Sequence, residues 1–435
     1  MYYTTLYILY TSVFVVLIFN CCIMKLLTDN REYLMEYINK IIHGDCLDKL
    51  KELEDNSVDA VVTDPPYGLS FMGKKWDYDV PSVEIWEECL RVLKPGGYLL
   101  SFAGTRTQHR MAVRIEDAGF EIRDMIAWVY GSGFPKSLNI GKAVDKLQGN
   151  EREVTGEKIL GGIKRARPDN AEGFSNPYTS GQTIGIETKG TSEWEGWGTA
   201  LKPAIEPITV ARKPLSEKTV AENVLKWGTG GINIDESRVK SDDWDEKTVM
   251  GKYIGNNENN ESVTNNFGVK EIKCTSPEST LLGRFPANFI HDGSDEVVDL
   301  FPNDSQRFFY CAKASKSERN KGCEGLEDIN VSSWHFKCEV CGHTYAEQKE
   351  KSGCHCENPK PIQWTGTSKN NHPTVKPIAL MEYLIKMVTP KGGIVLDPFA
   401  GSGSTLVAAK QNGFNYVGIE MTEEYLPIIN ARIGL

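Results

Sequence analysis

The sequence lacks two features that would place it in a simple class: a positive net charge and a regular cysteine framework. With 49 Lys and Arg against 59 Asp and Glu, its net charge of −10 argues against a chain that coats nucleic acid non-specifically. The 11 cysteines are odd in number and scattered, which argues against a secreted disulfide scaffold. The cysteines indicate reduced cytosolic thiols, some of which could bind a metal ion. The 435 residues suffice for one large core and a second domain or sizeable insertions.

Long apolar runs are also scarce, which argues against a multi-span membrane protein. One run, residues 6–23 within an N-terminal extension 1–36, approaches the roughly 20 residues that a membrane-spanning helix needs. It fits a membrane anchor or an uncleaved signal, or it is an extension upstream of a true start at Met24 or Met35. We expect the second, without membrane binding, because no basic segment precedes the run and nothing downstream needs a membrane.

Strands and helices alternate in two separated parts of the chain. Apolar periodicity predicts strands at residues 41–45, 58–62, 98–103, 121–130, 393–396 and 415–419, and helices at 46–54, 83–93, 108–118, 378–388, 404–411 and 423–433. Such alternation predicts an α/β fold, with a doubly wound, mostly parallel sheet built from two separated segments. Residues 131–368 are instead rich in Gly, Asn, Ser and Pro, and predict a large loop-rich insertion or second domain.

One predicted strand, residues 58–62, is followed after a single threonine by Asp64-Pro65-Pro66-Tyr67. The prolines cannot continue a strand, because they lack an N–H donor and fix φ. Asp64 and Tyr67 are therefore predicted at the carboxyl end of a strand. In an open α/β sheet this is the edge where ligands bind.

A glycine-rich turn follows the predicted strand at residues 393–396. Gly401 and Gly403 allow a ligand to approach the backbone closely, and Ser404 can cap the following helix. The lysine of a phosphate loop is missing, which disfavours a triphosphate. Glu420 ends the next strand at a spacing that suits the hydroxyls of a ribose. These residues favour an adenosine-bearing cofactor over a merely structural turn.

The ordered set of motifs resembles the β class of DNA amino-methyltransferases, which transfer a methyl group from S-adenosylmethionine to an exocyclic amine. The catalytic motif at residues 64–67 comes first, a variable middle follows, and the cofactor loop 397–403 comes last. The segments His-Pro-Thr-Val-Lys-Pro at residues 372–377 and Ile-His-Gly-Asp-Cys at residues 42–46 add to the resemblance. It implies a Rossmann-like domain with a catalytic half at 37–130, a target-recognition region at 131–368 and a cofactor-binding half at 369–435.

The resemblance also implies roles for single residues. The catalytic residues would be Asp64, Pro65, Pro66 and Tyr67. Asp397, Gly401 and Gly403 would bind the methionine part of the cofactor, and Phe399 and Ser404 belong to the same loop. Thr374 and Lys376 would bind the carboxylate of the cofactor. Glu420 would bind its ribose, and Asp45 would lie on its adenine side. For Asp45 and Lys376 the alternatives are an ordinary strand-end carboxylate and a surface lysine.

The chemistry of the reaction agrees with these roles. The lone pair of an exocyclic base amine is delocalised into the ring, so a site must turn it towards the methyl group. The Asp64 carboxylate and the Pro65 carbonyl would accept the two amine protons and so achieve this. The base must be flipped out of the duplex at a cost of a few kcal/mol, and stacking on Tyr67 would return roughly 1–3 kcal/mol. The alternative for Tyr67 is a ring packed over the sheet edge.

The middle region holds a candidate zinc ribbon at residues 338–356. Its ligands would be the thiols of Cys338, Cys341, Cys354 and Cys356. A structural zinc would fold a segment too short to form its own core. The second pair has a one-residue gap, so His343 or His355 could replace a cysteine, and four unrelated thiols are the alternative. Basic clusters at residues 164–167 and 307–321 suit DNA phosphates or form solvated faces.

The sequence thus predicts a cytoplasmic, bacterial or phage-encoded DNA methyltransferase of the restriction-modification type, acting on adenine N6 in double-stranded DNA. Aspartate before Pro-Pro-Tyr leans towards adenine in this family, and cytosine N4 and RNA are the alternatives. A non-catalytic zinc-ribbon DNA-binding protein is a further alternative. The sequence indicates no obligate protein partner, and it is compatible with either a monomer or a homodimer. For Asp64 to face the methyl group, the strands at 58–62 and 393–396 must be neighbours.

Overall fold

The computed structural model describes most of the chain beyond the N-terminal extension. The described residues are 37–69, 77–131, 133, 137–159, 184–239, 283–301, 308–338, 344–345 and 361–434. They divide into two compact units. The first contains the described residues up to 131 and those of 204–326 and 372–434, and the second contains those of 133–203 and 327–371.

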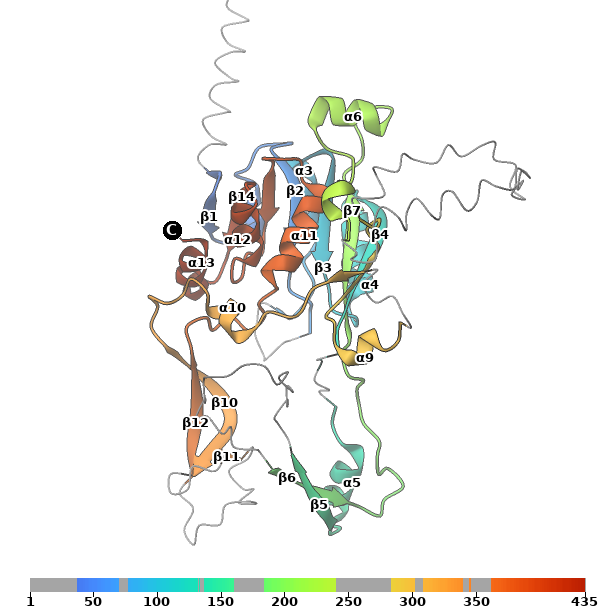
Figure 1. The fold of residues 1–435 in the computed structure, drawn as a ribbon, viewed down its shortest axis with the longest axis vertical. Coiled ribbons are helices and arrows are strands. Elements are labelled where there is room, and N and C mark those ends of the chain that lie inside the picture. The colour runs from blue at the N-terminus through green and yellow to red at the C-terminus, as the bar shows by residue number, and fades with distance from the viewer. Residues whose placement is uncertain are drawn as a thin grey trace, which may run out of the picture. The chain divides into compact units, whose positions relative to one another are not determined.

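The first unit is built around a sheet that has nine strands among the described residues (Figure 1). In spatial order they are β1 (Lys40–His43), β14 (Asn415–Glu420), β13 (Ile394–Asp397), β2 (Val58–Thr63), β3 (Leu93–Phe102), β7 (Ile205–Arg212), β4 (Glu121–Val129), β8 (Phe289–His291) and β9 (Phe309–Tyr310). Every described pairing is parallel except the two made by β7, which runs antiparallel to β3 and to β4. The sheet is therefore mostly parallel, as predicted.

Helices cover both faces of this sheet (Figure 1). One face packs against α11 (Ile378–Val388), α12 (Ser404–Gln411) and α13 (Leu426–Ile433), and the other against α2 (Cys46–Leu50), α3 (Val83–Val92) and α4 (Gln108–Asp117). Strand β2 is buried along its whole length, with Ala60 and Val62 in one core and Val61 in the other. Burying such an aliphatic side chain contributes about 1.5–3 kcal/mol, which fixes β2 in the centre of the sheet.

Shorter elements complete the first unit. They are α6 (Val220–Trp227), η3 (Asp235–Ser237), α9 (Asp295–Val298), α10 (Lys316–Asn320) and η5 (Glu423–Tyr425). The helix at residues 423–433 was predicted as one piece, and the structure divides it into η5 and α13.

Two features of the sheet differ from the predicted elements. Strand β3 begins at Leu93, although its proline and two glycines predict a break before residue 98. The pairing with β2 shifts register between Val58 and Ala60, and this irregularity accommodates the extra residues. Strands β7, β8 and β9 also join the sheet from the middle region, beyond the two predicted segments. Their strand signal is weak, because β8 and β9 are very short and β7 contains Pro207.

The second unit contains short antiparallel sheets. Strand β10 (Ile329–Cys338) lies between β11 (Thr344–Tyr345) and β12 (Pro361–Ser368). Strand β5 (Glu153–Ile159) pairs with β6 (Ile184–Lys189), and α5 (Ile140–Gln148) precedes them.

Two predicted segments lie outside the described residues: the apolar run at 6–23 and the basic cluster at 164–167. Within the described ranges, no helix combines the length and the apolar character needed to cross a membrane.

Candidate active site

The point where the sheet reverses its winding lies between β13 and β2. These strands are parallel neighbours, with Val395 opposite Ala60, so the predicted adjacency is confirmed. From β13 the chain moves outward to β14, and from β2 it moves in the opposite direction to β3. A crevice forms at the carboxyl ends of strands that diverge in this way, and it is the usual ligand site of open α/β sheets. Asp64 follows β2 and Asp397 ends β13, so both lie at the carboxyl ends of these two strands.

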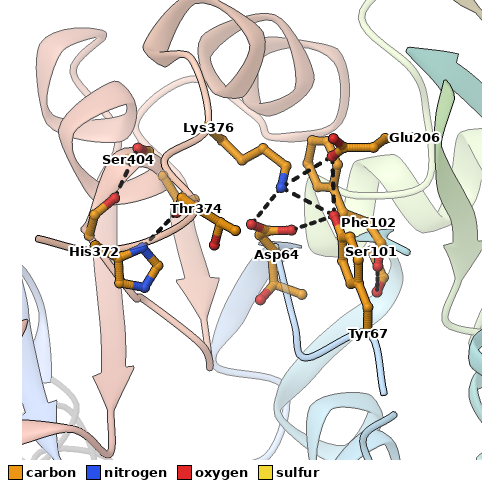
Figure 2. A network of polar contacts seen from close by, with 12 residues as sticks. Asp64, Tyr67, Ser101, Phe102, Glu206, His372, Thr374, Lys376 and Ser404 are labelled. Carbon is orange, nitrogen blue, oxygen red and sulfur yellow. Dashed lines mark hydrogen bonds and ion pairs between the residues drawn. The ribbon is translucent and has the colours of Figure 1, made fainter. Parts of the chain in front are cut away.

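Asp64 follows β2 directly and is held by two donors (Figure 2). Its Oδ2 accepts a hydrogen bond from the Lys376 ammonium at 2.6 Å, and its Oδ1 accepts one from the Tyr67 hydroxyl at 2.8 Å. Each carboxylate oxygen keeps a lone pair, so Asp64 can still accept from a further donor. Its side chain is 19 % exposed, which leaves it reachable from solvent.

The main chain of Tyr67 is fixed by two side chains that the sequence did not single out. The buried Asp77 carboxylate accepts hydrogen bonds from Tyr67 N at 2.7 Å and from Gly68 N at 2.9 Å. The Thr107 hydroxyl donates to the Tyr67 carbonyl at 2.6 Å. The loop after β2 therefore turns sharply and directs the Tyr67 ring back towards Asp64.

Glu206 is a second carboxylate of the site, and the sequence did not point to it. It lies near the start of β7, and because β7 is antiparallel, this end meets the carboxyl ends of its parallel neighbours. Its Oε2 lies 3.2 Å from the Tyr67 hydroxyl and 3.3 Å from the Lys376 ammonium. Its Oε1 accepts from the Tyr130 hydroxyl at 3.2 Å.

Lys376 is buried, which differs from the alternative of a surface lysine. Its ammonium lies 4.9 Å from the centre of the Phe102 ring and 5.4 Å from that of the Tyr67 ring. Burial acts to lower the pKa of Lys376, but the carboxylates of Asp64 and Glu206 raise it above its ordinary value. Lys376 is therefore charged at neutral pH.

The two carboxylates respond differently to this environment. Burial raises the pKa of Asp64, the Lys376 charge opposes that effect, and the result is a pKa above the ordinary value. Burial also acts to raise the pKa of Glu206, but the charges of Lys376 and Lys313 outweigh it and hold that pKa below its usual range. Burial and both carboxylates raise the pKa of Tyr67 well above its ordinary value, so its hydroxyl keeps the proton that it donates.

Asp397 ends β13 and anchors the neighbouring loop. Its carboxylate accepts hydrogen bonds from the Thr63 hydroxyl at 2.6 Å, the Thr405 hydroxyl at 2.5 Å and Phe399 N at 3.1 Å. Burial raises the pKa of Asp397 to about 6, although these hydrogen bonds act against the increase. The carboxylate thereby ties β2, the glycine loop and α12 together.

The glycine loop has the backbone that its sequence predicts. Gly401 and Gly403 have φ values of +56° and +77°, which favour glycine. Glu420 Oε2 accepts from Gly401 N at 2.7 Å, so the spacing between glycine and acid corresponds to a direct contact. The predicted cap is wrong: Gly403 is the N-cap of α12, and the Ser404 hydroxyl lies 3.2 Å from Arg432 Nη1 instead.

The remaining predicted site residues lie on different segments of the chain. Asp45 is exposed beyond β1 and caps α2 by accepting from Leu47 N at 2.9 Å. Thr374 is exposed, and its carbonyl lies 2.6 Å from His372 Nδ1. Phe399 is half-buried, with its ring 6.3 Å from that of Trp86. Pro65 and Pro66 follow Asp64 as in the sequence, with Pro65 buried and Pro66 half-buried.

Only part of the candidate zinc ribbon falls within the described residues. Cys338 ends β10 in the second unit, whereas Cys341, Cys354 and Cys356 lie outside the described residues. In the part of the chain that is described, no group of three or more His, Cys, Asp or Glu residues could hold a metal ion. The zinc ribbon therefore stays a prediction.

Comparisons with known proteins give one family match and several relatives. The DNA methylase family model for N6 and N4 methyltransferases matches residues 58–431. The type II methyltransferase M.HindIII of Haemophilus influenzae is 22 % identical over 92 % of this chain and 96 % of its own. M2.DpnII of Streptococcus pneumoniae is 44 % identical over 25 % of this chain and 52 % of its own.

Solved structures of methyltransferases are similar at lower identity. The M1.HpyAVI complex with S-adenosylmethionine is 16 % identical, covers 91 % of this chain and 99 % of its own, and has a TM-score of 0.38. The cytosine-N4-specific PvuII DNA methyltransferase is 14 % identical, covers 90 % of this chain and 85 % of its own, and has a TM-score of 0.41. Because the family model matches most of the chain, the protein belongs to the N6/N4 family of DNA methylases and is an S-adenosylmethionine-dependent DNA methyltransferase of adenine N6 or cytosine N4.

Proposed function

We propose that the protein methylates N6 of adenine at specific sites in double-stranded DNA, with Asp64 as the main acceptor of the target amine. The observation that supports this most strongly is the position of Asp64 at the reversal point of the sheet, across from the glycine loop. An aspartate, and not a serine, precedes Pro65-Pro66-Tyr67, which favours adenine over cytosine as the target.

The residues of the crevice fit S-adenosylmethionine. Gly401 of the glycine loop is half-buried, and the Glu420 carboxylate, fixed by Gly401 N and Thr422 N, keeps lone pairs that suit ribose hydroxyls. We assign the cofactor to the residues Asp45, Thr374, Asp397, Phe399, Gly401, Gly403, Ser404 and Glu420. Lys376 was predicted to bind the cofactor carboxylate, but its contact with Asp64 supports a different role, in which it acts on the acceptor itself.

The mechanism follows from the acceptors of the site. Bound S-adenosylmethionine would supply the methyl group as a sulfonium electrophile. Asp64 and the Pro65 carbonyl would accept the two amine protons and turn the nitrogen lone pair out of the ring plane. Asp64 would then stabilise the positive charge on the methylated nitrogen and take up its proton.

Tyr67 would receive the flipped base. Stacking on an aromatic ring contributes roughly 1–3 kcal/mol per base, which offsets much of the cost of flipping. The Tyr67 hydroxyl is held by Asp64, so the ring is already oriented beside the acceptor.

The DNA phosphates would be contacted partly by exposed lysines of the first unit. Lys316 begins α10 and Lys321 follows that helix, and both are exposed. Two other cations of the same cluster have partners in the fold: Lys313 lies 3.3 Å from the centre of the Tyr130 ring, and Arg319 donates to the His372 carbonyl at 2.7 Å. The homodimer and the cytoplasmic location stay predictions.

The function is tested by identifying the product. Unmethylated duplex DNA is incubated with the protein and labelled S-adenosylmethionine, digested to nucleosides and examined by mass spectrometry. We expect the label in N6-methyldeoxyadenosine. Label in N4-methyldeoxycytidine would overturn the choice of base. Label in RNA offered in parallel, with none in DNA, would overturn both the base and the DNA substrate.

We also propose a structural zinc bound by Cys338, Cys341, Cys354 and Cys356. Replacing both Cys338 and Cys341 by serine should remove about one zinc per chain, measured by metal analysis of the purified protein. The matched control is Cys46→Ser in the first unit, which should keep its zinc. Equal zinc in all three proteins, or none in the wild type, would contradict the proposal.

A further inference from the structure

The two donors that hold Asp64 are both shared with Glu206 (Figure 2). The Tyr67 hydroxyl lies 2.8 Å from Asp64 and 3.2 Å from Glu206, and the Lys376 ammonium lies 2.6 Å and 3.3 Å from the same two carboxylates. The ammonium also donates to the Tyr67 oxygen at 3.1 Å. Among the described contacts, both side chains that donate to Asp64 therefore also contact Glu206.

We propose that Glu206 and Lys376 are positioning residues for methyl transfer, which together orient Asp64 and set its charge for the incoming amine. The inference rests on the proposed role of Asp64 as acceptor. Neither residue needs to contact the base, because each acts through the Asp64 carboxylate.

The orientation of Asp64 depends on how Glu206 itself is fixed. The Oε2 of Glu206 faces Tyr67 and Lys376, while its Oε1 is held by the Tyr130 hydroxyl, and Tyr130 is buried directly after β4. Glu206 is thereby anchored to the neighbouring strand, and it limits the movement of both donors of Asp64. A carboxylate held in this way presents its free lone pairs in one direction, which a bimolecular reaction with an amine requires.

The charge of Asp64 depends on every group that faces it. Lys376 approaches from the segment before α11, Tyr67 from the loop after β2, Glu206 from β7 and Asp397 from β13, while Lys313 lies beyond Glu206. Lys376 favours the ionised form of Asp64, whereas Glu206 and Asp397 disfavour it. The carboxylates of Asp64 and Glu206 with one ammonium leave a local charge of −1, which complements the positive charge that develops on the amine nitrogen.

The two residues must therefore shift the pH dependence of methylation in opposite directions. Activity requires ionised Asp64, so kcat rises with pH through the pKa of that group, and this rising part of the profile is its acid limb. Glu206→Gln removes a neighbouring negative charge and should move the acid limb to lower pH. Lys376→Met removes the positive charge and should move it to higher pH, in each case by about one pH unit.

The experiment measures kcat between about pH 5 and 8 for both variants, with two conservative variants that retain the charges. Glu206→Asp and Lys376→Arg should keep the acid limb near its wild-type position, even where kcat falls. The matched control is Glu121→Gln, because Glu121 pairs with Arg212 at the opposite end of the same two strands, and its acid limb should not move. Cofactor affinity, measured by calorimetry, should change less than about twofold in every variant.

Two results would overturn the inference: an acid limb that stays in place in Glu206→Gln and Lys376→Met, or one that moves in the same direction in both. If Lys376→Met does not fold, the Glu206→Gln profile decides alone. An Asp64→Asn variant that methylates DNA normally would instead remove the proposed role of Asp64. The failure of the inference and the failure of the proposed function are therefore distinguishable.

Discussion

Replacing Asp64 by asparagine is expected to reduce the rate constant of methyl transfer by at least about ten- to hundredfold, with near-complete loss as the anticipated result. A hydrogen bond to a charged group contributes about 1.5–3 kcal/mol, and each 1.4 kcal/mol corresponds to about tenfold in rate. The amide also donates where the carboxylate accepts, and it cannot stabilise a positive nitrogen. The rate is measured as label transferred to DNA under single-turnover conditions.

A buried carboxylate within β2, Asp59, provides the control. Asp59 lies about 17 Å along β2 from Asp64, near the amino end of the strand. It accepts from the Lys94 ammonium at 2.6 Å and from Ile394 N at 2.7 Å. Asp59→Asn should therefore lower stability and leave the rate of the folded enzyme unchanged. If Asp64→Asn retained more than about a tenth of the wild-type rate, the assignment of Asp64 as acceptor would be wrong.

The sequence sufficed to predict the central strands and the edge of the sheet to which we assign the chemistry. Residues 58–62 and 393–396 are short, largely apolar runs, each followed closely by Asp-Pro at residues 64–65 and 397–398, and in the structure both strands end before that proline. Their adjacency followed from chemistry, because a carboxylate and a methyl donor must meet. The structure pairs them directly, with Leu396 opposite Val61.

The rest of the site depends on long-range pairing that leaves no local signal. Glu206 stands between an isoleucine and a proline in a region poor in strand pattern, and only the antiparallel pairing of β7 with β3 brings it to the site. Lys376 belongs to a motif of the family, but the sequence does not show its environment, because the same residue type occurs both in solvent and buried beside two carboxylates. Ser404 was a reasonable cap, but its hydroxyl is directed to Arg432, which lies 28 residues later.

Replacing Gly401 by alanine is expected to weaken S-adenosylmethionine binding by at least about tenfold, which corresponds to about 1.4 kcal/mol. Gly401 has φ +56°, a conformation that costs an L-residue about 1–2 kcal/mol. An added Cβ would also lie 2.9 Å from His372 Nε2. The His372 ring is buried, its Nδ1 lies 2.6 Å from the Thr374 carbonyl, and it makes a T-shaped contact with the Tyr425 ring, with 4.5 Å between ring centres, so the ring has little freedom to move aside.

The glycine loop must therefore move instead, and this would break the 2.7 Å contact between Gly401 N and Glu420 that fixes the proposed ribose ligand. Gly413→Ala separates this steric effect from the backbone cost. Gly413 has φ +73°, and an added Cβ would have no heavy atom of the described residues within 4 Å. It should lose about 1 kcal/mol of unfolding free energy and bind the cofactor normally by calorimetry. Equal cofactor affinity in the two variants would show that the loop tolerates the side chain, and that Gly401 does not shape the cofactor site.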